Sequence, residues 1–347
     1  MRKFCLLLTA LFPLLLLSCG GSKGDDPVVP PDPGPDPELP DPVYPSPGNG
    51  WTVKNVAEGI TYYAFSGTEP VTNAKQRVFV TDIDLSIPTY SVKMGFYPNT
   101  TTASAVLKEN DAFACINAGY EATSIWIRFE GRNKANIQND YITSGNYQIP
   151  QWKSEAAVYF DNDQDVRIEF TGKGMTLTEW RDTYRVRAKS ETNFLTSAPM
   201  LIDNYEPVGK DFCKNHPVKY SGCGEDPYVH QSSKTNPRTA IAKTAHNHVL
   251  FIVVDGRRNN VSRGISAAEL TQFLVSNFNP QYALNLDGGG SSTMCVKGQG
   301  DATTHVVNYP TDNMDGKGKD GSPQEASGVP DHAGERPRDT YLYVVAR

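Results

Sequence analysis

The sequence predicts an α+β fold with a mixed, strand-rich sheet core, a few packed helices and a single folded domain. Short apolar or alternating runs, which are typical of strands, outnumber the runs with helical spacing. The sequence contains no internal repeat. The chain has 347 residues, and the part after its first fifty, about 295 residues, is long enough for one large domain.

Residues 1–18 have the three parts of a secretory signal peptide. A basic start is followed by an apolar run over residues 4–17 and then by small residues. The run is shorter than the roughly 20 apolar residues that a membrane-spanning helix needs. Residues 16–19 (Leu-Leu-Ser-Cys) resemble the bacterial lipobox, which implies that Cys19 carries lipid at the mature N-terminus. The alternative is an ordinary signal peptide beside an incidental cysteine.

Residues 19–50 are expected to form a tether. Residues 22–26 (Ser-Lys-Gly-Asp-Asp) resemble the surface-export signal of Bacteroidetes lipoproteins, with a plain polar spacer as the alternative. Residues 27–47 consist largely of Pro, Asp and Gly, which bury too little apolar surface to fold. We therefore expect a folded domain over residues 51–347. The expected location is the outer membrane, with the domain at the cell surface, or facing the periplasm, and with the lipid as the only membrane contact.

The charge balance argues against nucleic acid as a partner. The chain has 33 Lys and Arg against 39 Asp and Glu, a formal net charge of −6. Of its six cysteines, Cys213 and Cys223 lie in a loop-like stretch and are the best disulfide pair. Cys115 and Cys295 lie in strand-like runs and are expected to be small buried residues. No cysteine or histidine spacing indicates a metal site or a cofactor, although an Asp could still bind a divalent cation.

Two strands, a short helix and a third strand are expected first in the domain. Residues 77–85 and 90–97 alternate well enough for strands. Residues 101–110 favour a short helix, and residues 112–118 form a compact apolar strand that ends at Gly119.

The middle of the domain predicts a hairpin. Residues 156–160 and 165–170 flank a turn at residues 162–163 (Asn-Asp). Residues 198–202 favour another short strand.

The last third has the clearest pattern. Residues 239–243 and 248–254 are expected to pair across an Asn-containing turn, and residues 282–286 and 341–345 are further strands.

The most convincing helix covers residues 266–277. Ser266 can cap its start, Glu269 falls at the third helical position, and the apolar residues Leu270, Phe273 and Leu274 share one face.

Three apolar strands stop at polar or glycine residues. Residues 248–254 run into Asp255, residues 282–286 run into Asp287, and residues 112–116 run into Asn117. Polar side chains at strand ends are where sites are commonly built, because the sheet holds them rigidly.

The glycine run at residues 288–290 is the strongest of these signals. Glycine weakens a strand, so three in a row after Asp287 indicate unusual backbone angles or close approach of a ligand. The run is not a phosphate-binding Walker loop, a dinucleotide fingerprint or a nucleophile elbow. The residues alone therefore predict an anion-binding or carbohydrate-binding strand end, with a tight glycine turn as the alternative.

A wider set of segments resembles the phosphodiester glycosidase family. The strongest is residues 285–293 (Asn-Leu-Asp-Gly-Gly-Gly-Ser-Ser-Thr). The resemblance covers roughly residues 77–345, and it departs from the family pattern at Ala118 and Glu121. Glu121 is either an additional acidic site residue or simply solvated. The other matching segments are residues 117–120, 197–201, 237–242, 254–257, 264–270 and 335–338.

The resemblance implies a hydrolase that cleaves a sugar from a phosphodiester. Such a reaction needs a carboxylate near the anomeric carbon and positive charge on the departing phosphate. Asp255 and Asp287 are the expected catalytic carboxylates, one as nucleophile or base and the other orienting or protonating. Arg238 is the expected phosphate clamp. The expected substrate-binding residues are Arg257 and Arg336 in support, Gly288, Gly289 and Ser291 as donors, and Thr239 and Asn117 to position the sugar.

The expected substrate is a sugar such as N-acetylglucosamine joined to a phosphorylated glycan or envelope polymer, bound within a single catalytic domain. The alternative keeps the fold but not the catalysis, as a surface lipoprotein that only binds phosphorylated glycans. A structural adhesin is a third alternative, and it would leave the glycine loop covered.

Overall fold

We describe the protein from a computed structural model. Residues Leu39–Arg347 form one compact unit. The structure describes residues 40–122, 124–137, 141–144, 147–150, 153, 155–162, 165–170, 192–209, 234–311 and 331–347.

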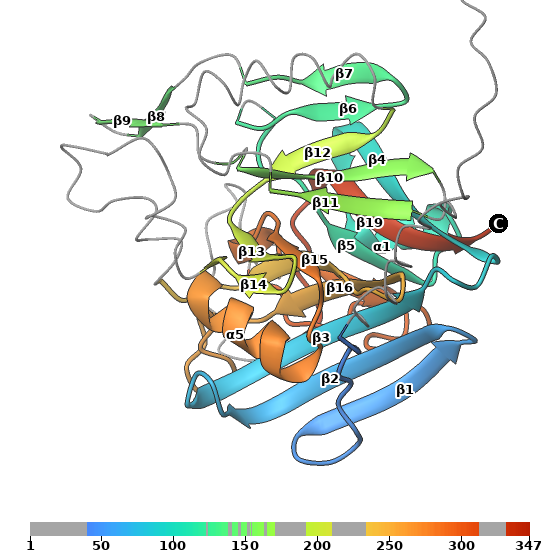
Figure 1. Ribbon diagram of the computed structural model, residues 1–347, viewed down its shortest axis with the longest axis vertical. Helices are drawn as coiled ribbons and strands as arrows, with labels where there is room; N and C mark the ends of the chain where they lie inside the picture. The colour runs from blue at the N-terminus through green and yellow to red at the C-terminus, as the bar shows by residue number, and fades with distance from the viewer. Residues whose placement is uncertain are drawn as a thin grey trace, which may run out of the picture. The chain divides into compact units, whose positions relative to one another are not determined.

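An eight-stranded sheet is the largest element of the fold (Figure 1). All its neighbouring strands are antiparallel. The start of one strand therefore lies next to the end of its neighbour. In spatial order the strands are β1 (Trp51–Ala57), β2 (Ile60–Glu69), β3 (Ala74–Asp84), β16 (His248–Val254), β15 (Arg238–Lys243), β17 (Tyr282–Asn285), β13 (Met200–Asp203) and β14 (Glu206–Pro207).

Two smaller sheets cover one face of this sheet, and a two-stranded hairpin completes the strands of the described residues. The four-stranded sheet has the order β18 (Met294–Val296), β5 (Ala114–Asn117), β19 (Arg338–Ala346) and β4 (Tyr90–Thr101). The five-stranded sheet has the order β11 (Asp165–Glu169), β10 (Ala156–Asn162), β12 (Phe194–Ser197), β6 (Ile127–Phe129) and β7 (Arg132–Ala135). The hairpin pairs β8 (Tyr141–Ser144) with β9 (Tyr147–Pro150).

Alternation along the strands divides the core into layers. Val249, Phe251 and Val253 of β16 face the two smaller sheets, whereas Leu250 and Ile252 face helix α5 (Ala267–Asn277), which lies against the other face of the large sheet (Figure 1). A third cluster packs the short helix α1 (Ala103–Glu109) against the four-stranded sheet.

Helix α5 begins as the sequence predicts. Ser266 accepts a hydrogen bond from the Glu269 backbone N–H, and the Glu269 carboxylate accepts one from the Ser266 backbone N–H. This reciprocal capping satisfies two donors at the helix start, and Leu270, Phe273 and Leu274 bury the expected face.

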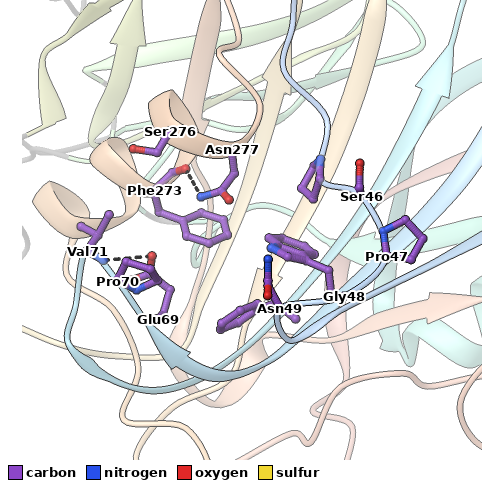
Figure 2. Close-up of a pocket in the computed structure, with 13 residues that line it drawn as sticks. Ser46, Pro47, Gly48, Asn49, Glu69, Pro70, Val71, Phe273, Ser276 and Asn277 are labelled. Carbon is purple, nitrogen blue, oxygen red and sulfur yellow. Dashed lines mark hydrogen bonds between the residues drawn. The ribbon is translucent and has the colours of Figure 1, made fainter.

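The segment before Trp51 also packs on the domain. The Val43 backbone N–H donates to the Phe278 carbonyl at 3.2 Å, and the Tyr44 ring stacks on Tyr63 with their centroids 6.2 Å apart. Figure 2 shows a cavity of about 390 Å³ in which Ser46–Asn49 form one wall, opposite Phe273 and the end of α5. The packed domain therefore begins before Trp51, the start expected from composition.

The strand-rich core and the single domain are confirmed, and the structure is mostly β. The strands expected from the alternating runs are present, as is the hairpin of β10 and β11. The structure has further strands that were not predicted, namely β1, β2, β6, β7, β8, β9, β12 and β14. Helices α1 and α5 are the only α-helices of the described residues, and neither is long and apolar enough to cross a membrane.

Two of the six cysteines lie among the described residues. Cys115 and Cys295 are buried free thiols directly opposite each other on β5 and β18. Cys19, Cys213 and Cys223 lie outside the described residues.

Candidate functional site

The three predicted strand ends meet beside the large sheet. The antiparallel register places Arg238 opposite Val254, and Ala240 opposite Asn285. The end of β16, the end of β17 and the start of β15 therefore share one edge. β5 belongs to the four-stranded sheet. Its end joins the other two, because the Asp287 backbone N–H donates to the Ala118 carbonyl at 2.9 Å.

Asp287 is buried beside an arginine. Its carboxylate lies 3.2 Å from the Nη2 atom of Arg338, and the residue is 7% exposed. Burial raises the pKa of Asp287 to about 6, and the charge of Arg338 opposes this shift. The carboxylate is therefore mostly ionised at neutral pH, in a site from which water is largely excluded.

The glycines after Asp287 permit a close approach between two backbones. A Cβ atom on Gly288 would lie 2.7 Å from the Pro237 carbonyl oxygen. The Gly289 backbone N–H donates to that same oxygen at 2.9 Å, and Gly289 has a φ of +66°. The loop then forms the short 3₁₀ helix η2 (Gly289–Ser291). The buried Ser291 hydroxyl has no hydrogen-bond partner among the described residues, and it lies close enough to Asp287 to lower the pKa of that carboxyl.

This approach leaves a small cavity of about 190 Å³. Asp287 lies in its wall together with Gly288, Gly289 and two arginines, and the backbone turn at residues 236–237 closes one side. The remaining lining residues are Arg238, Arg257 and Tyr120. A carboxylate and two guanidinium groups thus share one cavity.

The two arginines are held differently. Arg238 is buried, and its guanidinium donates to the carbonyls of Ile265 and Lys234, each at 3.0 Å. Arg257 is exposed, and its Nη2 atom donates to Asn236 Oδ1 at 3.4 Å. Arg238 therefore supplies a fixed positive charge, whereas the longer bond of Arg257 can be exchanged for one to a ligand.

Asn117 and Thr239 lie beneath the loop and outside the lining of the cavity. The Asn117 amide donates to the Asp287 carbonyl at 2.7 Å, and its oxygen accepts from the Thr239 hydroxyl at 2.9 Å and from the Thr293 backbone at 3.0 Å. Both side chains are buried, so they hold the loop in place.

Asp255 is separated from the lining of this cavity. Its carboxylate accepts hydrogen bonds from the Tyr309 backbone N–H at 3.0 Å and from the Asn308 amide at 3.1 Å. The Asn308 amide also donates to the Ser292 carbonyl, which links Asp255 to the loop that carries Asp287. Burial raises the pKa of Asp255 to about 7, even though these bonds and the charges of nearby arginines lower it.

Two neighbours of Asp287 were not among the predicted site residues. Arg338 begins β19, two positions after the predicted Arg336, and Arg336 does not line the cavity. The sequence signal was the second arginine of residues 335–338, placed after Pro337 where the strand starts. Tyr120 lines the cavity, and its hydroxyl donates to the Ala198 carbonyl at 3.0 Å.

Glu121 lies at the side of the site. Its carboxylate pairs with the Lys153 ammonium at 2.6 Å and is 60% exposed. The ammonium also lies 4.6 Å from the centre of the Tyr120 ring. Glu121 does not line the cavity, but its charge contributes to the raised pKa of Asp287. No group of three or more His, Cys, Asp or Glu in the described part of the chain is arranged to hold a metal ion.

Comparison with known proteins agrees with the predicted family. The family model for phosphodiester glycosidases matches residues 114–322, which include Asn117, Arg238, Asp255 and Asp287. A search of the curated proteins found no match.

Solved structures show the same fold at low sequence identity. One is the catalytic domain of zebrafish N-acetylglucosamine-1-phosphodiester alpha-N-acetylglucosaminidase, auto-inhibited by its pro-peptide. It matches with a TM-score of 0.56 and 16% identity over 89% of this chain and 88% of that chain. A putative exported protein from Burkholderia pseudomallei matches with a TM-score of 0.52 and 12% identity over 89% of this chain and 99% of that chain.

Proposed function

The chain belongs to the phosphodiester glycosidase family, and from that premise we propose that Asp287 acts on the anomeric carbon of a sugar-1-phosphodiester bound in the cavity. The observation that carries this proposal is a buried carboxylate that shares one cavity with Arg238 and Arg257. The enzyme is a hydrolase: water replaces the phosphate at the anomeric carbon, and the electron pair of the broken carbon–oxygen bond leaves with the phosphate oxygen.

Asp287 supplies the negative charge that stabilises the anomeric carbon. The anomeric carbon becomes positive as the phosphate departs, and a nearby carboxylate stabilises it, as nucleophile or as base for the attacking water. A pKa of about 6 keeps Asp287 ionised at neutral pH and leaves it basic enough to accept a proton. The ion pair with Arg338 holds the carboxylate in one orientation.

Arg257 and Arg238 stabilise the departing phosphate. A guanidinium group can donate two parallel hydrogen bonds to phosphate oxygens. Arg257 is the direct contact, because its side chain is exposed and its hydrogen bond to Asn236 is long. Arg238 adds fixed positive charge from the buried wall, where its bonds to two carbonyls prevent it from moving.

Asp255 acts by orienting the site. Its carboxylate holds Asn308, and Asn308 holds the carbonyl of Ser292 in the loop after Asp287. Asp255 is therefore the orienting carboxylate of the pair, and Asp287 is the one that meets the substrate.

A turnover screen tests the proposal. The panel contains sugar-1-phosphodiesters of several sugars with one aglycone, each beside its sugar-1-phosphate monoester. N-acetylglucosamine is the first sugar to test, because the zebrafish protein is named for that sugar. We expect release of the free sugar from at least one diester. The anomer of the first product, followed by NMR, assigns Asp287 as nucleophile if configuration is retained and as base if it is inverted.

Tight binding without turnover of any diester would contradict the proposal and favour a lipoprotein that only binds phosphorylated glycans. Turnover that stays unchanged in Asp287→Asn would contradict the assigned role while leaving the activity intact.

We also propose that the mature protein is an outer-membrane lipoprotein displayed at the cell surface. The support is the lipobox-like sequence that ends at Cys19 and the Pro-rich stretch after it. Metabolic labelling with a fatty acid should mark the wild-type chain and not Cys19→Ala. Protease added to intact cells should remove the domain. Equal labelling of both chains would contradict lipidation at Cys19, and protection from protease would place the domain in the periplasm.

A further inference from the structure

A second cavity lies on the hairpin of β2 and β3. It has a volume of about 320 Å³ and lies between β2, β3 and the turn at residues 260–261. It shares no lining residue with the cavity at Asp287. Its polar lining residues are Ser66, Thr68, Lys75, Arg77 and Asn260, and none of its lining residues is acidic.

The register of β2 and β3 builds this cavity. Thr68 lies directly opposite Lys75, and Ser66 lies directly opposite Arg77. Because strand side chains alternate, these two cross-strand pairs point to the same face. Two hydroxyl groups therefore face two cations across one hairpin.

The nearest carboxylate on the hairpin faces away. Glu69 follows Thr68 on β2, so its side chain points to the other face, where it is buried. Its two oxygens accept hydrogen bonds from the backbone N–H groups of Val71 and Thr72, at 3.1 and 2.7 Å. Glu69 is thus occupied and cannot neutralise Lys75.

Arg77 lowers the pKa of the Asp255 carboxyl by its charge, but this carboxylate lies beyond ion-pair distance. Neither Lys75 nor Arg77 forms an ion pair with any described residue. The Arg77 guanidinium lies 4.3 Å from the centre of the Tyr309 ring, and its Nε atom is buried without a hydrogen-bond partner among the described residues. Buried donors are normally satisfied, so this nitrogen can donate to an acceptor that binds beside it.

Asp255 does not fill that role. Its oxygens are held by Tyr309 and Asn308, and burial keeps its pKa near 7. Arg258 adds a third cation on the neighbouring turn, and its Nη1 atom is also buried and unpartnered among the described residues. The result is a concentration of positive charge in a chain whose formal net charge is −6.

We propose that this cavity is an anion site that binds a phosphate group through Arg77 and Lys75. The guanidinium group suits two phosphate oxygens, the flexible ammonium suits a third, and the Ser66 and Thr68 hydroxyls donate from the opposite strand. Stacking on Tyr309 holds Arg77 in place before the anion arrives.

The bound group is a phosphate, and it can come from either of two molecules. It is free phosphate, or it is a second phosphate of a polymeric substrate whose first phosphodiester lies in the cavity at Asp287. The second source rests on the proposed function, whereas the site itself does not.

Isothermal titration with inorganic phosphate at pH 7.5 tests the site. The folded chain without its first 38 residues is the sample, since Leu39–Arg347 is one compact unit, and the intact chain in detergent is titrated beside it. We expect phosphate affinity at this site to fall at least tenfold in Arg77→Gln and about threefold to tenfold in Lys75→Gln. Arg132→Gln removes the same charge from an exposed position on β7 and should leave the affinity unchanged.

Arg257→Gln distinguishes phosphate binding in the two cavities, because it weakens only phosphate bound beside Asp287. Phosphate affinity that is equal in Arg77→Gln and Arg132→Gln would overturn the proposal. So would loss of all phosphate binding in Arg257→Gln. An inactive wild-type chain that binds phosphate through Arg77 would count against the proposed function alone.

Kinetics with Lys75→Gln identifies the source. A KM that rises about threefold or more only for a substrate with a second phosphate on its aglycone assigns the site to substrate. Equal KM values for substrates with and without that phosphate, together with weaker phosphate titration, assign it to free phosphate.

Discussion

Asp287 and Asp255 occupy equivalent places in the sequence, yet their surroundings differ. Each follows an apolar strand of the same sheet and precedes glycine, and each is buried with a raised pKa. Asp287 faces a cavity and pairs with the side chain of Arg338. Asp255 is held by Asn308 and by the backbone of Tyr309.

The difference shows that burial alone does not make a carboxylate catalytic. Desolvation is the largest cause of the raised pKa at both positions. What separates them is access to a cavity and the kind of partner. A side-chain ion pair leaves room for substrate, whereas a set of backbone and amide donors occupies the carboxylate oxygens.

The largest expected effect is that of Asp287→Asn. The change keeps the shape and removes the charge, so kcat should fall about 10³-fold or more with a sugar-1-phosphodiester. Asp111→Asn, at an exposed position, should retain wild-type turnover. Circular dichroism of each variant checks the fold. A loss of less than tenfold in the folded variant would show that Asp287 is not the reacting carboxylate.

Asp255→Asn should cost less, about 10-fold to 100-fold in kcat, because it loosens the loop and leaves Asp287 in place. The distinguishing measurement is the pH profile: the variant should keep the limb near pH 6 that belongs to Asp287. If Asp255→Asn proves more damaging than Asp287→Asn, the two roles are reversed.

The pH dependence of the rate sharpens the comparison further. The ionised form of Asp287 is the active one, so the rate should rise with pH through about 6 and then level off. The side chains that shift the pKa of Asp287 are Arg338, Ser291, Glu121 and Lys153, and Arg338 is the strongest of those that lower it. Arg338→Gln should therefore move the limb to higher pH, whereas Arg132→Gln should not. A limb that stays near pH 6 in Arg338→Gln would contradict the ion pair.

The smallest expected effect concerns stability. A carboxyl with a raised pKa binds more protons in the folded state than in the unfolded state, so its contribution to stability falls as pH rises. The window runs from the unfolded pKa of 3.8 to about 7 for Asp255 and to about 6 for Asp287. Urea unfolding at pH 5, 6 and 7 should show a shallower loss between pH 6 and 7 in Asp255→Asn than in Asp287→Asn. Equal slopes in that interval would mean that the two carboxyls are buried alike.

The positions of the three strand ends could be predicted from the sequence because local patterns carry them. An apolar run that ends at Asp or Asn is visible without tertiary information, and so is the helix capped by Ser266 and Glu269. The early hairpin of β1 and β2 was not predicted, although it lies within the expected domain. Its aromatic residues acquire their meaning only from packing, as Trp51 does by stacking on Phe273.

Arg338 could not be chosen over Arg336 from spacing alone. The choice depends on the register of β19 against β5, which places Tyr341 opposite Asn117 and carries Arg338 to the end of that strand. The Asn308 bond to Asp255 likewise joins residues 53 positions apart, and no periodicity in the chain encodes that contact.

The sequence by itself determined the family, the strand-rich class and the chemistry of the strand ends. These depend on residue type and on short-range spacing, which can be read from the sequence without knowledge of the fold. The tertiary structure decided which carboxylate faces a cavity, which arginine pairs with it and where the cations of β3 form no ion pair with a described residue. Each of these depends on desolvation and on contacts between distant segments, and both arise only when the sheets pack.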